Sequence, residues 1–361
     1  MKVESLDVAV FTVPTEQPES DGTLVWHETT VVVVEPTAAG VRGLGFTYAT
    51  AACAPLIRDV LRETVVGTDA MDVPGAWTAM VTAIRNQGRP GIASMAIAAV
   101  DIALWDLKAR LLDLPLARLL GMVRPATPIY GSGGFTSYST RQLLDQLAGW
   151  VNDDGIPSVK MKVGRDPAAD AERVGAARNA IGPAATLMID ANGAYSAKQA
   201  VRLARAFADQ DVSWFEEPVS SDDLVGLRTV RELIDIDIAA GEYGYDLPYF
   251  AHMAGSGAVD VLQADVSRCA GITEWLRVAA VAAAHDLGVS AHCAPSLHAH
   301  PACAVPNVVH LEYFHDHARV DRLLFDGVLD PSEGMLTPDL TRAGMGLELK
   351  RADAERYRRA A

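Results

Sequence analysis

Hydrophobic and polar positions change their rhythm along this chain near residue 125. Before that point, β-prone runs at 3–13, 29–35 and 41–48 precede helical patterns near 54–63, 73–84 and 92–112. The last two strands are joined by a turn through Pro36 and Gly40. The first third of the chain is therefore predicted to be an α+β unit with a small antiparallel sheet.

After residue 125, short apolar runs alternate with helical segments of roughly ten to fifteen residues, which is typical of βα units in a parallel sheet. Eight strands are predicted, at 127–131, 158–163, 186–190, 212–215, 237–240, 260–263, 288–292 and 308–312. This number favours a (β/α)8 barrel over an open doubly wound sheet. The glycine-rich run at 131–134 lacks the spacing of a dinucleotide fingerprint, so nucleotide binding is not expected.

These patterns divide the chain into three predicted parts. Residues 1–125 form an α+β capping domain, residues 126–320 form the barrel, and residues 321–361 form an irregular segment that returns to the cap. Residues 350–359 are expected to be a solvated helix. The predicted fold class is thus α/β, a (β/α)8-type barrel with a cap that the C-terminal segment completes.

Composition and charge limit the partners. The chain has 361 residues, half of them apolar, and a formal net charge of −15, which argues against a nucleic-acid-binding surface. Its four cysteines have neither zinc nor redox spacing, and the N-terminal residues lack the apolar run of a signal peptide. The most apolar stretch, 91–112, is interrupted by Asp101, Asp106 and Lys108, so a soluble helix is expected. We therefore expect a cytoplasmic protein with no membrane or nucleic-acid partner.

Polar residues stand at the ends of most predicted barrel strands. The carboxyl ends of parallel strands meet at one face of a barrel, so these side chains are expected to converge. In chain order they are Lys160, Lys162, Asp190, Glu216, Glu242, Asp265, His292 and Glu312.

Three of these residues are carboxylates on successive strands. Asp190, Glu216 and Glu242 are separated by 216 − 190 = 26 and 242 − 216 = 26 residues, which is one βα repeat each. Hard oxygen ligands of this kind favour Mg²⁺, with Mn²⁺ as the alternative. Glu217 follows Glu216 directly, and the residue pattern alone leaves open which of the two binds the metal.

The remaining strand-end residues are candidate proton carriers. Strand alternation places Lys160 and Lys162 on the same side, where burial and like charge lower the pKa of an ammonium group and allow it to act as a base. A structural alternative is that both lysines only pair with nearby carboxylates. Asp265 stands at the end of the strand beside that of His292 and is expected to orient the imidazole as a second acid–base group.

Two His-x-His pairs, His298 with His300 and His315 with His317, offer another metal motif. Such pairs occur in zinc hydrolase barrels. Both pairs lie past the predicted strand ends, and no cysteine or histidine cluster in the sequence completes them. A zinc enzyme is therefore not favoured.

With these residues placed, the chain resembles the enolase superfamily, specifically the mandelate racemase subgroup, over nearly its full length. The matching segments are residues 98–109, 114–116, 119–121, 188–192, 214–218, 239–242 and 271–273. The resemblance implies an enolase-type N-terminal cap and Mg²⁺ ligation by Asp190, Glu216 and Glu242. It thereby selects the first of the two adjacent glutamates.

The same resemblance implies roles for the other strand-end residues. Lys162 is the base, and Lys160 is the neighbour that lowers its pKa. Asp265 and His292 form the acid–base dyad on the opposite face of the substrate. Glu312 is the acid that hydrogen-bonds the substrate carboxylate.

Substrate contacts are expected from Asn192 and from the cap. Segments 15–26 and 49–55 are expected to be flexible and to close over the barrel mouth, with Trp26 and His27 as candidate contacts. A role in the cap core is the alternative for Trp26 and His27. The few charges of these segments do not identify the substrate.

The implied reaction is Mg²⁺-dependent removal of the proton alpha to a carboxylate, through an ene-diolate intermediate. Dehydration of a sugar acid, an aldonate or aldarate, to a 2-keto-3-deoxy acid is the favoured outcome. Racemisation or epimerisation of a 2-hydroxy acid such as mandelate is the alternative. Cycloisomerase activity is in doubt, because Asp265 and His292 stand where cycloisomerases place a late lysine. The resemblance also implies a homo-oligomer, from dimer to octamer. The non-enzymatic alternative, a barrel kept only as a scaffold, is disfavoured because no metal-ligand or base residue is missing.

Overall fold

Strands β1 (Ser5–Ser20) and β2 (Val25–Ala38) form a long antiparallel hairpin in the computed structural model, which describes residues 1–359. β2 also pairs with β3 (Val41–Arg42) and β4 (Gly45–Tyr48). Side chains of the valine run 31–34 point alternately toward the barrel core and toward the cap helices. The run is unbroken by polar residues because both faces of the sheet are covered.

Five helices form the rest of the cap. They are α1 (Cys53–Leu56), α2 (Arg62–Val65), α3 (Val73–Ala83), α4 (Ile92–Leu111) and α5 (Leu116–Leu120), with a π-helical segment (Ile57–Leu61) between the first two. Helices α1, α2 and α4 pack on the sheet, α3 packs on α4, and α5 packs between α4 and α12 (Pro295–Cys303) of the barrel. The buried Asp101 on α4 accepts hydrogen bonds from the backbone and hydroxyl of Thr273, on the barrel side. The acids that interrupt the apolar stretch therefore include one that joins cap to barrel. No helix within residues 1–359 is long and apolar enough to cross a membrane.

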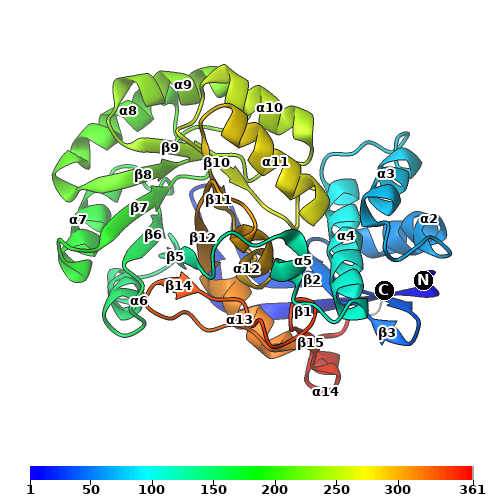
Figure 1. Ribbon diagram of the computed structural model, residues 1–361. Coiled ribbons are helices and arrows are strands. Elements are labelled where there is room, and N and C mark those ends of the chain that lie inside the picture. The colour runs from blue at the N-terminus through cyan, green and yellow to red at the C-terminus, as the bar shows by residue number, and fades with distance from the viewer. Residues whose placement is uncertain (360–361) are drawn as a thin grey trace.

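Eight parallel strands form a closed barrel, in which β12 pairs with β5 to complete the ring (Figure 1). In chain order they are β5 (Thr127–Gly133), β6 (Ser158–Lys162), β7 (Thr186–Asp190), β8 (Val212–Glu216), β9 (Asp237–Ala240), β10 (Val261–Ala264), β11 (Gly288–Ala291) and β12 (Val308–Phe314). The helices that follow them are α6 (Thr140–Asn152), α7 (Asp170–Ile181), α8 (Ala197–Ala206), α9 (Leu224–Leu233), α10 (Leu247–Ser256), α11 (Ile272–Ala284), α12 (Pro295–Cys303) and α13 (His315–Leu324). The predicted fold class, a barrel with an α+β cap, is confirmed.

Apolar side chains fill the middle of the barrel interior. Tyr130, Met188, Trp214 and Ala239 form a buried layer there. Two residues further along three of these strands, on the same side of the pleat, stand Ser132, Asp190 and Glu216. The barrel is therefore packed below this level, and its polar chemistry lies at the carboxyl ends of the strands.

The C-terminal residues contact both parts of the fold. β14 (Met335–Leu336) pairs with β5 of the barrel, and β13 (Phe325–Asp326) pairs with β15 (Glu348–Leu349). Arg359 donates a backbone hydrogen bond to the carbonyl of Val10 on β1. Helix α13 runs through residue 321, where the sequence pattern places the end of the barrel. Near the terminus the helical structure consists of α14 (Arg351–Ala354) and a 3₁₀ turn (Glu355–Tyr357).

The tip of the β1–β2 hairpin lies against the barrel mouth. Thr136, just after β5, donates its backbone N–H to the carbonyl of Ser20 at 2.8 Å. A Cβ on Gly22 would lie 2.5 Å from the carbonyl oxygen of Ala191, so the close approach requires glycine. The segment 15–26, expected to be a flexible closing loop, is thus built mainly from the ends of two paired strands.

Candidate active site at the carboxyl end of the barrel

Five ionisable residues converge at the carboxyl ends of strands β6 to β9. Lys160 and Lys162 lie on β6, Asp190 ends β7, Glu216 ends β8, and Glu242 follows β9. The strand register places Lys162 beside Asp190 and Asp190 beside Glu216. All five side chains are buried. The structure therefore brings together residues that come from four separate βα units.

The three acids form a compact cluster. Asp190, Glu216 and Glu242 each offer a carboxylate oxygen, and these oxygens lie within 4.8 Å of one another. Burial and then the neighbouring Asp190 raise the pKa of Glu216 to about 8, because burial disfavours the ionised form and the two like charges repel each other where water does not screen them. A divalent cation offsets this repulsion, and a ligand set of oxygen atoms alone suits Mg²⁺.

Unpaired oxygen atoms surround the cluster. Glu242 Oε2, Glu217 Oε1 and Asn192 Oδ1 are buried and have no hydrogen-bond partner among the described residues. Because buried polar atoms are rarely left unpaired, this arrangement fits a site that takes a hydrated cation. The three-oxygen group contains Glu216 and not Glu217.

Both lysines contact carboxylates. Lys160 Nζ lies 2.6 Å from each oxygen of Glu216 and 2.8 Å from Glu312 Oε1, and Lys162 Nζ contacts Asp190 Oδ2. Burial lowers the pKa of each ammonium group, but these carboxylates raise it by more, so both pKa values lie above the ordinary value. We expected lowered values from the sequence. Lys160 does lower the pKa of Lys162, yet contact with Asp190 outweighs that effect.

An acid–base pair joins the ends of β10 and β11. Asp265 Oδ2 accepts a hydrogen bond from His292 Nδ1 at 2.9 Å, which leaves Nε2 free to exchange a proton. Ser267 fixes Asp265 by donating its backbone N–H and its hydroxyl to the other carboxylate oxygen, both at 2.7 Å. Burial lowers the pKa of His292, but Cys293 and Glu242 raise it well above the ordinary value. Because His292 Nε2 lies 3.3 Å from Glu242 Oε2, the imidazole reaches the three-acid cluster.

Glu312 on β12 accepts hydrogen bonds at both of its oxygens. Ser132 Oγ donates to Oε1 at 2.5 Å, and the backbone N–H of Cys293 donates to Oε2 at 2.8 Å. Burial raises the pKa of Glu312, but Lys160 and His292 lower it well below the ordinary value. Glu312 is therefore a carboxylate that accepts hydrogen bonds in this arrangement. To hydrogen-bond a substrate carboxylate, as expected from the sequence, it must first take up a proton.

Arg268 is a site residue that the sequence analysis missed. Its Nη1 donates to the backbone oxygen of Glu242 at 3.1 Å and to Glu242 Oε1 at 3.3 Å. Its Nε lies 3.6 Å from Asp265 Oδ2, and its guanidinium stacks over the ring of Tyr243. Arg268 thus links the acid cluster to the acid–base pair. Its position three residues after Asp265, in the turn that follows a strand end, was the available signal.

The cap adds the aromatic side chain of Trp26 and a buried acid, Glu19, for which the sequence analysis predicted no role. The Trp26 ring meets Phe135 edge to face at 5.5 Å, and Trp26 Nε1 donates to Glu19 Oε2 at 2.9 Å. Glu19 is 1% exposed, and burial together with Asp316 raises its pKa to about 8. His27 is exposed and, by strand alternation, lies on the opposite face of β2 from Trp26. The structure therefore places Trp26 near the mouth and does not bring His27 to the other site residues.

The His-x-His pairs have structural partners. His298 Nε2 accepts the backbone N–H of Val266, and His300 Nδ1 accepts that of Ala117. His317 Nδ1 accepts the backbone N–H of Ala294. Two sets of three residues within 1–359 have side-chain atoms close enough to hold a metal ion, and neither set includes a residue of these His-x-His pairs.

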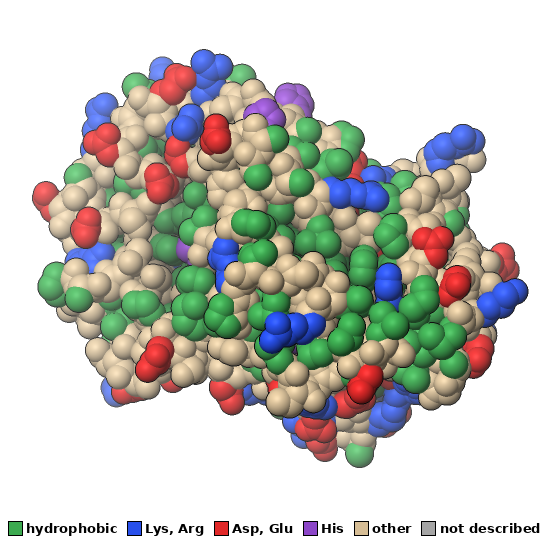
Figure 2. Space-filling view, viewed as in Figure 1, with side chains coloured by type: hydrophobic (Ala, Val, Ile, Leu, Met, Phe, Trp, Pro, Cys, Tyr) green, Lys and Arg blue, Asp and Glu red, His purple; other side chains and the backbone are tan. Residues whose placement is uncertain are grey.

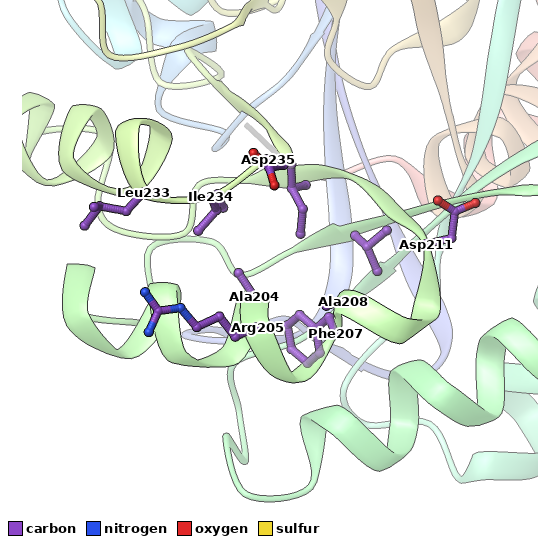
Figure 3. A pocket seen from close by; sticks show the side chains of 10 residues that line it. Ala204, Arg205, Phe207, Ala208, Asp211, Leu233, Ile234 and Asp235 are labelled. Carbon is purple, nitrogen blue, oxygen red and sulfur yellow. The ribbon is translucent and has the colours of Figure 1, made fainter.

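A surface cavity of about 440 Å³ lies at the opposite end of the barrel. Figure 3 shows that its walls come from the end of α8 and from the connection between α9 and β9. It contains none of the strand-end residues described above. Figure 2 shows acidic and basic side chains interspersed on one face of the molecule.

The chain matches two family models. Residues 5–121 match the N-terminal domain of mandelate racemase / muconate lactonizing enzyme, and residues 142–354 match the enolase C-terminal domain-like model. Two characterised relatives are 3,6-anhydro-alpha-L-galactonate cycloisomerase of Streptomyces coelicolor and L-talarate/galactarate dehydratase of Salmonella typhimurium. The first is 36% identical, over 85% of this chain and 86% of the relative, and the second is 31% identical, over 87% and 81%.

Solved structures share the whole fold. A mandelate racemase/muconate lactonizing enzyme-like protein from Rubrobacter xylanophilus has a TM-score of 0.97 and 54% identity, covering 99% of this chain and 100% of that chain. A racemase from Streptomyces coelicolor with bound magnesium has a TM-score of 0.93 and 31% identity, with the same coverage. The relatives thus include dehydratases, cycloisomerases and a racemase, and at least one solved structure carries magnesium.

Proposed function

This chain belongs to the mandelate racemase / muconate lactonizing enzyme group of the enolase superfamily, and we propose that it removes the proton alpha to the carboxylate of a sugar acid. Asp190, Glu216 and Glu242 hold a divalent cation, Mg²⁺ by the chemistry of its ligands. Lys162 and His292 carry protons on two sides of the bound acid.

One observation carries this proposal: two proton carriers from different parts of the barrel reach the same acid cluster. Lys162 contacts Asp190, and His292 Nε2 lies 3.3 Å from Glu242 Oε2. Their strands, β6 and β11, are separated in the ring by β5 and β12 on one side and by four strands on the other. A carboxylate bound at the cluster is therefore flanked by an ammonium group and an imidazole.

The acid cluster and the two lysines have different chemical roles. A cation on the three acids supplies positive charge that makes the alpha proton more acidic. If Asp190 held a cation, Lys162 would lose its strongest partner, and the neighbouring Lys160 would still lower the pKa of Lys162. Lys162 is then suited to take the alpha proton, and Lys160, beside Glu312, remains as a fixed positive charge.

The partner of Lys162 determines the product. Asp265 holds His292 with Nε2 directed away from the carboxylate, so the imidazolium form donates a proton from that atom. Donation to the β-oxygen of the substrate releases water and gives a 2-keto-3-deoxy acid. This dehydration is the reaction we favour, and dehydratases are among the relatives.

A second candidate is the opening of an anhydro-sugar acid. When the β-oxygen belongs to a ring ether, the same proton donation opens the ring without loss of water. The cycloisomerase relative at 36% identity supports this outcome, which the lack of a late lysine had placed in doubt. Racemisation, in which His292 returns a proton to the alpha carbon, is the third outcome and is the activity stated for one similar structure.

The mouth favours an aldonate over an aldarate. Four cations there are engaged with acids: Lys160 with Glu216, Lys162 with Asp190, Arg268 with Glu242, and Arg319 with Asp316. The wall beside Cys293 consists of the aromatic residues Trp26, Phe135, Tyr138 and Phe314. The second carboxylate of an aldarate meets aromatic rings and the buried Glu19 there, whereas the terminal hydroxyl of an aldonate carries no charge to be balanced.

The test is proton exchange in D₂O. Aldonates, aldarates and anhydro-aldonates are incubated with Mg²⁺ and the protein, while NMR follows the alpha proton and a semicarbazide assay detects keto acids. We expect exchange with an active substrate to fall about a thousandfold in Lys162→Ala. We expect His292→Asn to retain exchange better than keto-acid formation.

A matched control separates chemistry from folding. Lys198→Ala removes an exposed lysine on α8 and should leave exchange unchanged. Full activity in both Lys162→Ala and His292→Asn contradicts the proposed function.

A further inference from the structure

Three side chains of different chemistry meet beside the acid cluster, at the end of β11. His292 Nε2 lies 3.3 Å from Cys293 Sγ and 3.7 Å from Glu312 Oε2. Each of the three residues offers an atom within 4.8 Å of the others, and all three are buried. This nitrogen, sulfur and oxygen group differs from the oxygen-only set of the acid cluster.

The distances fit a tetrahedral metal site. A zinc ion bound at about 2.3 Å to sulfur and about 2.0–2.1 Å to nitrogen and oxygen keeps its ligand atoms roughly 3.3–3.6 Å apart. The separations of 3.3 and 3.7 Å around His292 Nε2 are close to these values. Small movements of the side chains therefore suffice to bind such an ion.

The surroundings resemble those of a metal-binding histidine. Asp265 accepts the Nδ1 proton of His292, and a carboxylate in this place fixes the ring with Nε2 available to a metal. Glu242 Oε2, which is buried and has no hydrogen-bond partner among the described residues, lies 3.3 Å from the same nitrogen. Because Glu242 also belongs to the acid cluster, the protein ligands of this second site are His292, Cys293 and Glu312.

The backbone holds Cys293 in this position. Cys293 and Ala294 both have positive φ angles, of 47° and 44°. The backbone N–H of Cys293 donates to Glu312, and that of Ala294 donates to His317. These bonds fix the turn, so the thiol stays beside the imidazole.

We propose that Zn²⁺, or another thiophilic divalent cation, binds to His292, Cys293 and Glu312 and inhibits the enzyme. Binding replaces the thiol proton of Cys293 and the Nε2 proton of the His292 imidazolium, both of which are released to solvent, and it involves no oxidation or reduction. The bound ion occupies His292 Nε2 and so removes the proton donor. Inhibition rests on the proposed function, whereas binding of the ion does not.

Binding is tested with Cd²⁺, whose thiolate complexes absorb in the ultraviolet. The Mg²⁺-loaded protein is titrated with Cd²⁺, and we expect a thiolate-to-metal absorption band that saturates with one ion per chain. The band should disappear in Cys293→Ser and Cys293→Ala. It should persist in Cys303→Ser, which removes another buried cysteine, at the end of α12. Thermal unfolding of each variant verifies that it is folded.

Inhibition is tested with Zn²⁺ in the presence of excess Mg²⁺. Relative to its own Mg²⁺-supported activity, Cys293→Ser should need at least about tenfold more Zn²⁺ for half inhibition than Cys303→Ser. The absence of a Cd²⁺ band in the wild-type protein overturns the proposal. So does a band that survives in both Cys293 variants, or equal Zn²⁺ sensitivity of Cys293→Ser and Cys303→Ser. If no substrate is turned over, the proposed function fails, but the Cd²⁺ band still decides on the site.

Discussion

The two ends of the barrel treat polar groups in opposite ways. At the amino end, the guanidinium of Arg178 donates to the backbone carbonyls of Gly182, Ala185, Gln210 and Asp211 at 2.7–3.0 Å. At the carboxyl end, buried oxygens of Glu242, Glu217 and Asn192 have no partner among the described residues. Like charges also gather at the carboxyl end, in the three-acid cluster.

This difference separates stability from function. By donating to loop carbonyls, Arg178 joins neighbouring segments of the fold, and these hydrogen bonds form without any bound ligand. The three cluster carboxylates contact Lys160, Lys162 and Arg268, and a metal ion would compensate their charge further. The amino end is therefore built for stability, and the carboxyl end stores interactions that a metal ion and a substrate complete.

The largest effect should come from removing a cluster acid. Asp190→Asn replaces a charged ligand by a neutral one, so we expect Mg²⁺ affinity to fall about 100-fold or more, and proton exchange with it. Isothermal titration with Mg²⁺ measures the affinity. Asp211→Asn, which alters an aspartate lining the cavity at the amino end, is the matched control and should bind Mg²⁺ normally. Equal affinities in the two variants contradict the division between the ends.

The opposite result is expected for Arg178→Met. This variant loses the hydrogen bonds to loop carbonyls, and we expect the free energy of unfolding to fall by about 2–4 kcal/mol. Mg²⁺ affinity of the folded protein should not change. Denaturant unfolding and Mg²⁺ titration on the same preparation measure both quantities. A variant of normal stability and weakened Mg²⁺ binding breaks the comparison.

The carboxyl end could be predicted from the sequence because barrel geometry is regular. Each predicted barrel strand overlaps an observed one, and the 26-residue spacing anticipated that Asp190, Glu216 and Glu242 lie together. The sequence did not predict which lysine contacts which carboxylate. The pKa of Lys162 rises because its ammonium group meets Asp190, and that of Lys160 rises because it meets Glu216 and Glu312, contacts that the spacing of strands does not reveal.

The cap contribution could not be predicted, because it depends on packing between distant segments. Glu19 lies in a stretch that reads as a polar loop, yet the hairpin buries it against the start of α13, where Asp316 stands. Arg268 likewise acquires its role only when β9 and β10 bring Glu242 and Asp265 together. Local pattern identifies strand ends, whereas contacts of this kind require the folded chain.

A smaller effect should distinguish two substrates that differ only at their far end. Galactonate and galactarate share their stereochemistry, but galactarate carries a second carboxylate. Because Lys160, Lys162, Arg268 and Arg319 are engaged with acids and the wall beside Cys293 is aromatic, we expect the alpha proton of galactonate, or of another aldonate, to exchange at least about tenfold faster than that of the matched aldarate. Initial rates of exchange in D₂O measure the ratio. A faster aldarate indicates that the mouth supplies a free cation.

The smallest effect should be a pH-dependent gain in stability from Glu19→Gln. Burial and Asp316 raise the pKa of Glu19 to about 8 from an ordinary value of 4.5. Between these values the folded chain keeps a proton that the unfolded chain has released, so the stability of the wild-type protein falls as pH rises through this window. Glutamine does not titrate and still accepts the Trp26 hydrogen bond.

The difference in melting temperature between Glu19→Gln and the wild-type protein should therefore be small near pH 5, grow toward pH 8, and stay constant above it. Thermal unfolding across this pH range measures it. Glu28→Gln, at a mostly exposed acid of the same hairpin, is the control and should lack the rise toward pH 8. A gain in Glu19→Gln that does not vary with pH means that Glu19 is ionised in the fold. The cap would then share the charged character of the acid cluster instead of presenting a neutral wall.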